Sequence, residues 1–341
     1  MKKIVKICLL SIFITLISSC ATSINVKVLR PAELDLNGAK TISVLPIKPY
    51  EYYELREDAT GIDIFVGVFF QIFDRVGTEE KKCIDKLQYE IERGLMDSPY
   101  IDLVSSSAVS SAIKNGTSNP ADVYLTGEVV NFEVYDDHID RKVKVKDGDG
   151  DRKAEYEYVR EYSRNAKLYL RYQIVDSYSG KVISYNRVEM RNSSGYYSHP
   201  SDLPSAYSML EYELTRAARK ILRELQPYTV TKSISLLKDK TKDEDFKYAD
   251  KLAKDGYIKE SYDAFSSLYK TTEMLEAGYN AAKLMEAMGN LSEAEKLMAN
   301  LYIKYPVSEV KTGLYDIRNE INQAKKLKSQ TESSDVLDVD F

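Results

Sequence analysis

Residues 166–190, AKLYLRYQIVDSYSGKVISYNRVEM, decide the fold of the central part of the chain. Apolar side chains recur at every second position over 168–174, which is the period of a strand with one buried face. The Ser-Gly pair at 179–180 supplies a turn, and a second strand-like run follows over 182–190. The stretch therefore predicts a β-hairpin with one face packed on a core.

The segments before and after this hairpin alternate between strand and helix patterns. Strands are predicted at 41–47, 101–104 and 121–130, and helices at 78–96, 107–114 and 205–225. Thr78 is a candidate N-cap for the first helix, and Asp97-Ser98-Pro99 ends it. The order β-α-β-α-β-β-β-α favours an α+β fold, a mixed sheet with helices packed on it. We place this domain at 40–236.

The first twenty residues have the pattern of a bacterial export signal. Lys2, Lys3 and Lys6 precede an apolar run that is too short to span a bilayer as a helix. The run ends in Leu16-Ile17-Ser18-Ser19-Cys20, which resembles the lipobox of bacterial lipoproteins. The resemblance implies cleavage of residues 1–19 between Ser19 and Cys20. The alternatives are a plain secretory signal with a chance cysteine, or an uncleaved anchor.

A lipobox implies that Cys20 carries the lipid, a diacylglycerol with further acyl chains such as palmitate, that holds the protein on a membrane. Residues 20–39 are interpreted as a linker between that lipid and the fold. Position 21 is Ala rather than Asp. Under the enterobacterial sorting rule this permits delivery to the outer membrane, with the domains facing the periplasm.

The pieces at 42–47, 99–114, 121–130 and 175–182 together resemble the curli-secretion lipoprotein family (CsgG-like) and the related TolB N-terminal-type domain. The chain also looks like uncharacterised envelope lipoproteins of Bacteroidetes and spirochaetes. The resemblance implies the fold, an envelope location and a homo-oligomer. Curli-export proteins build an oligomeric pore by inserting hairpins into the outer membrane. Here the corresponding segment, 138–161, is densely charged, which excludes it from hydrocarbon.

The C-terminal third shows a repeat of 33 residues. Gly256, Ser261 and Phe265 recur as Gly289, Ala294 and Met298. This pattern resembles the tetratricopeptide repeat (TPR), with a small residue between paired helices and an aromatic plug. We predict an all-α, TPR-like domain at 242–328; the alternative is a plain pair of helical hairpins.

TPR-like helices imply a concave surface that binds a protein partner. The residues proposed for that surface are Tyr257, Phe265 and Tyr279. The remaining residues, 329–341, are polar and acidic and are expected to be disordered.

Composition and motifs argue against an enzyme, a metal site and a bound cofactor. The formal net charge is −5, which argues against nucleic acid as a partner, and only two histidines are present. Asp147-Gly-Asp149-Gly-Asp151 starts like a calcium loop but lacks its later ligands, so a polar turn is expected. Tyr156, Tyr158 and Tyr162 have the even spacing of a packed sheet face.

These observations predict a non-enzymatic envelope lipoprotein that acts as a protein-binding or assembly scaffold. The alternative is an oligomeric outer-membrane export channel of the curli type. That alternative would require the apolar segment 61–76 to enter the membrane. The same segment is equally compatible with an oligomer interface or with a core-capping loop.

Overall fold

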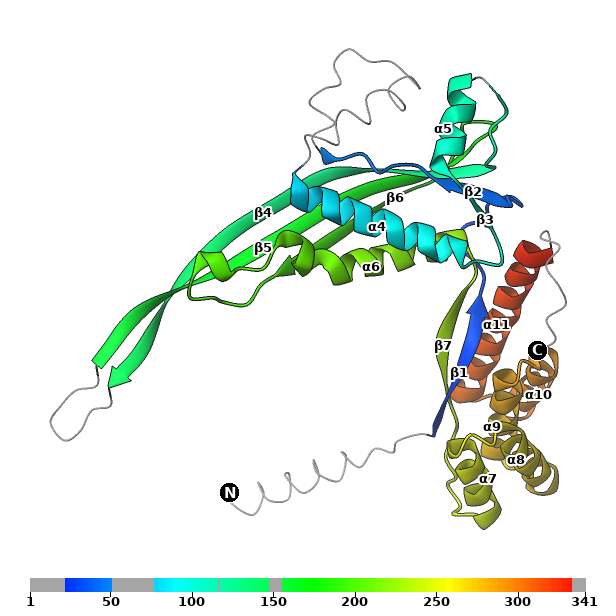
Figure 1. Ribbon diagram of the computed structural model, residues 1–341. Coiled ribbons are helices and arrows are strands. Elements are labelled where there is room, and N and C mark those ends of the chain that lie inside the picture. Colours follow the sequence, from blue (N-terminus) through cyan, green and yellow to red (C-terminus); the bar gives the residue numbers. More distant parts are fainter. Residues whose placement is uncertain (1–21, 51–76, 116, 147–154, 333–341) are drawn as a thin grey trace. The chain divides into compact units, whose positions relative to one another are not determined.

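The computed structural model describes residues 22–50, 77–115, 117–146 and 155–332. The predicted signal sequence with Ser19 and Cys20, the apolar segment 61–76 and the aspartates of 147–151 lie outside these ranges. The described chain forms two compact units (Figure 1). One unit contains residues 32–227 together with 330–332, and the other contains 22–31 and 228–329.

The first of these units, here called the αβ unit, is built on a five-stranded sheet of order β3-β2-β4-β5-β6. Strands β2, β3 and β4 are parallel, and β4, β5 and β6 are antiparallel. The bounds are β2 Thr41–Val44, β3 Asp102–Val104, β4 Val123–Lys146, β5 Glu155–Asp176 and β6 Val182–Ser193. The predicted mixed sheet is confirmed, and so is the β5–β6 hairpin.

Two long helices, α4 (Thr78–Met96) and α6 (Ala206–Leu225), pack on one face of this sheet (Figure 1). Ser205 caps α6 by accepting a hydrogen bond from the backbone N–H of Ser208. Helix α4 begins at Thr78, the predicted cap, so Gly77 rather than Thr78 is the N-cap residue. A shorter helix, α5 (Ser106–Asn115), packs through Val109 on Leu45 and Ala121.

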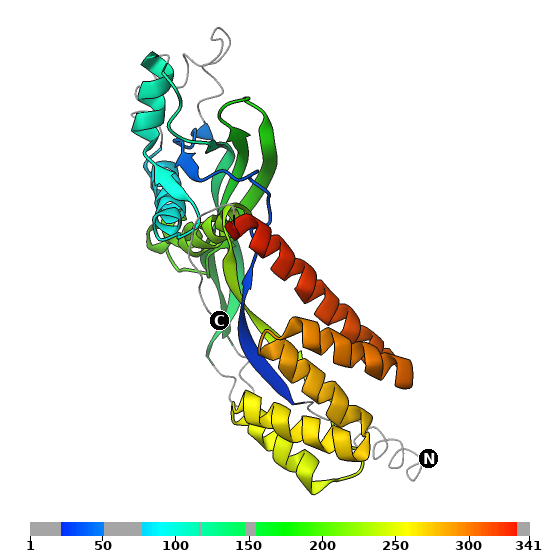
Figure 2. The same ribbon diagram turned by 90° about the vertical axis from the view of Figure 1, so that its right-hand side faces the viewer.

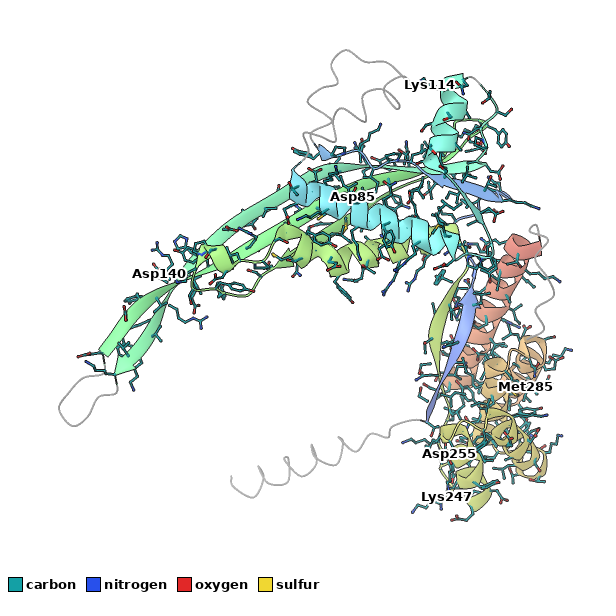
Figure 3. All side chains as sticks on the ribbon, viewed as in Figure 1. Asp85, Lys114, Asp140, Lys247, Asp255 and Met285 are labelled. Atoms are coloured by element: carbon teal, nitrogen blue, oxygen red, sulfur yellow. The ribbon has the colours of Figure 1, made fainter. Side chains whose placement is uncertain are left out.

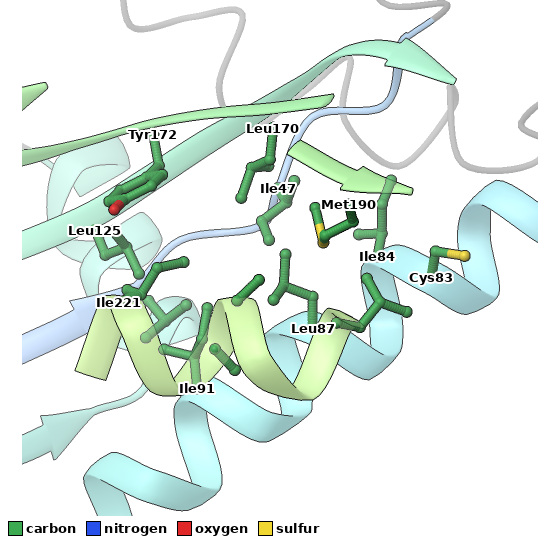
Figure 4. Close-up of a cluster of buried hydrophobic side chains, with 14 of the residues drawn as sticks. Ile47, Cys83, Ile84, Leu87, Ile91, Leu125, Leu170, Tyr172, Met190 and Ile221 are labelled. Atoms are coloured by element: carbon green, nitrogen blue, oxygen red, sulfur yellow. The ribbon is translucent and has the colours of Figure 1, made fainter. Parts of the chain in front are cut away.

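The core of the αβ unit lies between the sheet and the α4–α6 pair (Figure 4). Strand β5 contributes the alternating side chains of Leu168, Leu170, Tyr172 and Ile174, as the period of two predicts. Each of these residues is at most 2% exposed. Cys83 lies in this cluster and is fully buried, as a small core residue.

The second unit, here called the helical unit, contains helices α7 Glu244–Lys254, α8 Ile258–Thr272, α9 Leu275–Ala287, α10 Leu291–Lys304 and α11 Ser308–Glu332. Helices α7 to α10 pack as consecutive neighbours (Figure 2). The helical character predicted for 242–328 is confirmed. Helix α11 continues to Glu332, so the first four residues of the stretch expected to be disordered, 329–332, are helical.

The residues of the 33-residue pattern occupy equivalent positions in this unit. Gly256 and Gly289 follow α7 and α9 with φ values of +87° and +82°, a conformation that favours glycine. Ser261 and Ala294, in the next helices, are both fully buried, as are Phe265 and Met298. The repeat in the sequence therefore corresponds to a repeat in space.

The helical unit also contains two strands that the sequence interpretation missed. Strand β1 (Ser23–Arg30) pairs antiparallel with β7 (Tyr228–Ser235) along its whole length. Residues 23–30 are therefore not the predicted linker, and the strand at 228–235 belongs here rather than to the 40–236 domain. These strands belong to the helical unit because Ile24 and Ile234 are buried in one apolar cluster with its helices.

A cluster of opposite charges lies between these strands and the helices. Glu320 of α11 accepts two hydrogen bonds from the Arg30 guanidinium, at 2.6 and 2.8 Å, and one from Lys232 at 2.5 Å. Lys232 also donates to Glu286 at 2.6 Å. Burial raises the pKa of the Glu320 carboxyl, but the hydrogen bonds from Arg30 and Lys232 outweigh it, so the net pKa is lowered.

A Glu320→Gln variant is expected to lose on the order of 2 kcal/mol of unfolding free energy at neutral pH, because the charge-assisted bonds are weakened. A carboxyl whose pKa is lower in the folded chain than in the unfolded chain stabilises the fold at pH values above the unfolded pKa, which is ordinarily about 4.5. This stabilisation is lost as the pH falls through the lower pKa of the folded chain. Urea unfolding at pH 7 and pH 3.5 measures the difference. An equal gap between wild type and variant at both pH values would contradict the assignment.

Candidate functional site

The most exposed feature of the αβ unit is the outer part of the β4–β5 hairpin. Strand β6 ends at Ser193, opposite Asn165 of β5. Just beyond that pair, Tyr162 of β5 still exchanges two backbone hydrogen bonds of 2.8 Å with Tyr197, and further out β4 and β5 continue as a two-stranded ribbon to Lys146↔Glu155. We call residues 134–146 and 155–164 the β-ribbon; Figure 1 shows it extending past the helices of its unit. A two-stranded hairpin by itself is only marginally stable in water.

One face of the β-ribbon is rich in tyrosine and basic side chains. It continues the core-facing side of the sheet, on which Leu168 lies opposite Phe132. Further out, this face carries the cross-strand pairs His138↔Tyr162, Asp140↔Arg160, Lys142↔Tyr158 and Lys144↔Tyr156. The opposite face carries the pairs Ile139↔Glu161, Arg141↔Val159 and Val143↔Glu157. Both faces therefore mix apolar or aromatic groups with charges.

The tyrosines of the β-ribbon are not a packed sheet face, contrary to the prediction. Tyr156 is 52% exposed and Tyr158 is 69% exposed, because no helix or strand of the described chain covers them. Tyr156 lies under the ammonium of Lys142, which is 4.4 Å from the ring centroid. Tyr162 faces His138 at a centroid distance of 6.3 Å. Even spacing identified a shared face correctly, but not whether that face is covered.

Cross-strand ion pairs hold the register of the β-ribbon. Arg160 donates to the Asp140 carboxylate at 2.8 Å, and Arg164 donates to Asp136 at 2.7 Å (Asp140 is labelled in Figure 3). The hydrogen bond from Arg164 lowers the pKa of the Asp136 carboxyl. Exposed pairs of this kind contribute little stability, so they fix geometry more than they strengthen the fold.

Large apolar side chains are concentrated on the β-ribbon to a degree seen nowhere else in the described chain. The residues exposed there are Val134, Tyr135, Ile139, Val143, Val145, Tyr156, Tyr158 and Val159. Single exposed apolar residues are ordinary, but contiguous ones mark interaction surfaces. The charged segment 138–161 was predicted only as a departure from the curli-export pattern. Its alternation of aliphatic residues with charges was the available signal for a strand.

The helical unit places the three predicted binding residues differently. Tyr257, just before α8, is 57% exposed and is available to a partner. Phe265 is fully buried in the core, and Tyr279 is only 8% exposed. These two residues are therefore packing residues, because an aromatic plug between helices is a core position. The other large exposed side chains of the unit are Tyr248, Ile303, Val307 and Tyr315.

No group of three or more His, Cys, Asp or Glu side chains within the described ranges is arranged to hold a metal ion. Within the same ranges, no helix is long and apolar enough to span a bilayer.

Comparison with known proteins finds no matching family model and no matching curated protein. Among solved structures, the chain is similar to the PelC dodecamer from Paraburkholderia phytofirmans, with 14% identity, 60% of this chain and 98% of that chain covered, and a TM-score of 0.26. Lipoprotein GNA1162 from Neisseria meningitidis gives 12% identity, coverage of 53% and 97%, and a TM-score of 0.21. A hypothetical protein from Chlamydia trachomatis is 13% identical to this chain. The match covers 54% of this chain and 95% of that protein, with a TM-score of 0.25.

Proposed function

We propose that this chain is a lipid-anchored, non-enzymatic scaffold of the bacterial envelope whose αβ unit self-associates through the β-ribbon. The observation that carries the proposal is the group of exposed apolar and aromatic side chains, on both faces of a ribbon whose outer part has no covering layer in the described chain. Burial of such side chains is the main source of association energy between proteins. The anchor is the proposed lipid on Cys20, and the outer membrane facing the periplasm is the proposed location.

The composition of the β-ribbon suits an aqueous interface between chains. Interface cores are enriched in tyrosine, and charged pairs around them set register and partner choice. Tyr156 and Tyr158 provide large, rigid anchors, while Asp140–Arg160 and Arg141–Glu161 provide the charges.

The alternative, an export channel, has weaker support. A hairpin that enters the membrane needs one continuous apolar face. In the β-ribbon, one face contains Lys142 and Lys144, and the other contains Arg141, Glu157 and Glu161. The segment 61–76, which the channel would also use, lies outside the described residues.

We propose a docking role for the helical unit, whose repeat we interpret as TPR-like. Two helix pairs with equivalent buried small residues, Ser261 and Ala294, support this interpretation. With Phe265 and Tyr279 in the core, the tyrosines of this unit that are exposed for contact with a protein partner are Tyr248, Tyr257 and Tyr315.

Self-association is tested with the full chain, extracted in detergent after crosslinking in cells. A Tyr156→Ser/Tyr158→Ser variant is expected to weaken assembly by on the order of 100-fold, because two interface anchors are removed. The matched control is Tyr89→Ser/Tyr178→Ser, which removes two exposed tyrosines of the same unit. Light scattering on the purified proteins measures the mass. Wild-type monomers, or equal assembly by both variants, would contradict the proposal.

A further inference from the structure

Thr22, two positions after the proposed lipid on Cys20, is already packed into the helical unit. It is 6% exposed, and its carbonyl accepts a hydrogen bond of 2.8 Å from the backbone N–H of Leu236. Strand β1 starts at the next residue and pairs with β7 over all of its eight residues. Two residues span at most about 7 Å. A lipid on Cys20 would therefore hold this part of the helical unit close to the bilayer.

Contacts along helix α9 show which end of the helical unit lies beside Thr22. Strand β7 and the residues after it run antiparallel to α9, so the start of α9 lies at the same end as Thr22. The three contacting pairs, in order along β7, are Lys232–Glu286 at 2.6 Å, Leu237–Asn280 at 2.7 Å and Lys240–Glu276 at 3.1 Å. We call residues 22–23, 235–242 and 273–276 the lipid-proximal end.

The segment 238–242 of this end reads KDKTK and presents positive charge to solvent. Lys238 and Lys242 are exposed. The carboxylate of Asp239, in contrast, is used within the turn, where one oxygen accepts hydrogen bonds from the N–H and the hydroxyl of Thr241 at 2.5 and 2.7 Å. Its other oxygen is buried. The outward charges of the segment are therefore those of its lysines.

Two of these lysines are available to an external anion. No carboxylate of the described chain forms an ion pair with Lys238 or Lys242. The two acidic residues that follow along the chain have other partners, because Asp243 caps helix α7 and Glu244 pairs with Lys247 at 2.6 Å. Electrostatic attraction acts over about 8 Å at physiological ionic strength. With a tether of about this length, the phosphates of the lipid headgroups are anions within reach.

We propose that the lipid-proximal end is a membrane-contact surface, on which Lys238 and Lys242 bind the phosphate groups of lipids around the anchor. This inference rests on the lipid proposed for Cys20. It adds that the helical unit touches the bilayer through one defined end. Tyr257 follows the opposite end of helix α7, so it stays accessible to a protein partner while the lipid-proximal end is on the membrane.

Fluorescence quenching tests the contact in the full lipidated chain, reconstituted in liposomes of phosphatidylethanolamine and phosphatidylglycerol. In a Cys83→Ala background, one fluorophore is attached at Ser235→Cys or at Thr229→Cys, two exposed positions on the same face of β7. These positions are about 20 Å apart along the strand. A nitroxide on the headgroups should quench the label at 235 on the order of threefold more strongly, because contact quenching acts over a shorter range than this spacing.

Charge reversal tests the two lysines. Lys238→Glu/Lys242→Glu is expected to reduce the quenching at 235 to about half or less, because the reversed charges repel the lipid phosphates. The matched control is Lys259→Glu/Lys296→Glu, which reverses two exposed lysines on helices α8 and α10 and should leave the quenching unchanged.

The outcomes separate the contact from the anchor. Equal quenching at 235 and 229, in chains that float with the liposomes, would overturn the contact and leave the lipid anchor intact. Unchanged quenching in Lys238→Glu/Lys242→Glu would also overturn the contact, because its cations would then have no role. Chains that do not float with the liposomes would overturn the anchor, and the contact with it.

Discussion

Replacing Phe265 with alanine is expected to lower the unfolding free energy of the helical unit by about 3–5 kcal/mol. Phe265 is fully buried and meets Phe246 edge-to-face, with ring centroids 4.9 Å apart. Truncation removes this aromatic pair and leaves a cavity among Leu268, Ala281 and Leu284, which share its cluster. The rest of a helical repeat cannot close such a cavity without moving both helices.

Calorimetry of the full chain measures the effect as a shift of the helical unit's transition, while the transition of the αβ unit serves as an internal reference. The control is Tyr257→Ala, at an exposed position of the same repeat, which should change stability by no more than about 0.5 kcal/mol. If the two variants were equally stable, Phe265 would not be a core residue. The two variants also distinguish a packing role from a docking role, because Tyr257→Ala should weaken docking without lowering stability.

Local periodicity predicted those elements whose neighbours along the chain are also their neighbours in space. The β5–β6 hairpin, helix α4 and helix α6 follow directly from apolar spacing and from start and stop residues. The glycines at 256 and 289 were identified by the repeat alone, and both adopt a positive φ. In each case the information needed is contained within a few residues.

Strand β1 could not be predicted in this way, because its partner lies about two hundred residues further along. Ile24, Val26 and Val28 alternate as a strand should. A lipobox just upstream favoured a linker, and only the pairing of Ser23 with Ser235 shows otherwise. Nothing in the sequence between β1 and β7 indicates that these two strands pair.

The outer part of β4 and β5 shows a different limit. High charge density argued against buried structure, and the structure agrees, yet the segment is paired from Asp136 to Lys146 apart from a register shift at Val145. A ladder of backbone hydrogen bonds does not require a buried face, and cross-strand pairs such as Asp140–Arg160 are compatible with solvent. Strand formation and burial are separate questions, and alternation answers only the first. For this reason Tyr156 and Tyr158 were correctly placed on one strand face but wrongly predicted to be packed.

A Cys20→Ala variant is expected to lose all acyl label and to keep residues 1–19, since both the lipid acceptor and the cleavage signal proposed for the lipobox are removed. Wild type should incorporate a clickable palmitate analogue and stay with membranes through a carbonate wash. Several acyl chains are needed for such retention, because one chain binds only marginally.

Cys83→Ala provides the control within the same chain. Cys83 is fully buried between α4 and the sheet, and burial raises the pKa of its thiol to about 12. A neutral, inaccessible thiol is a poor acyl acceptor, so the Cys83 variant should be labelled and processed like wild type. Label that persists in Cys20→Ala would remove the anchor from the proposed function. It would leave the β-ribbon interface untouched, because that interface rests on the exposed side chains of Tyr156 and Tyr158 and not on the lipid.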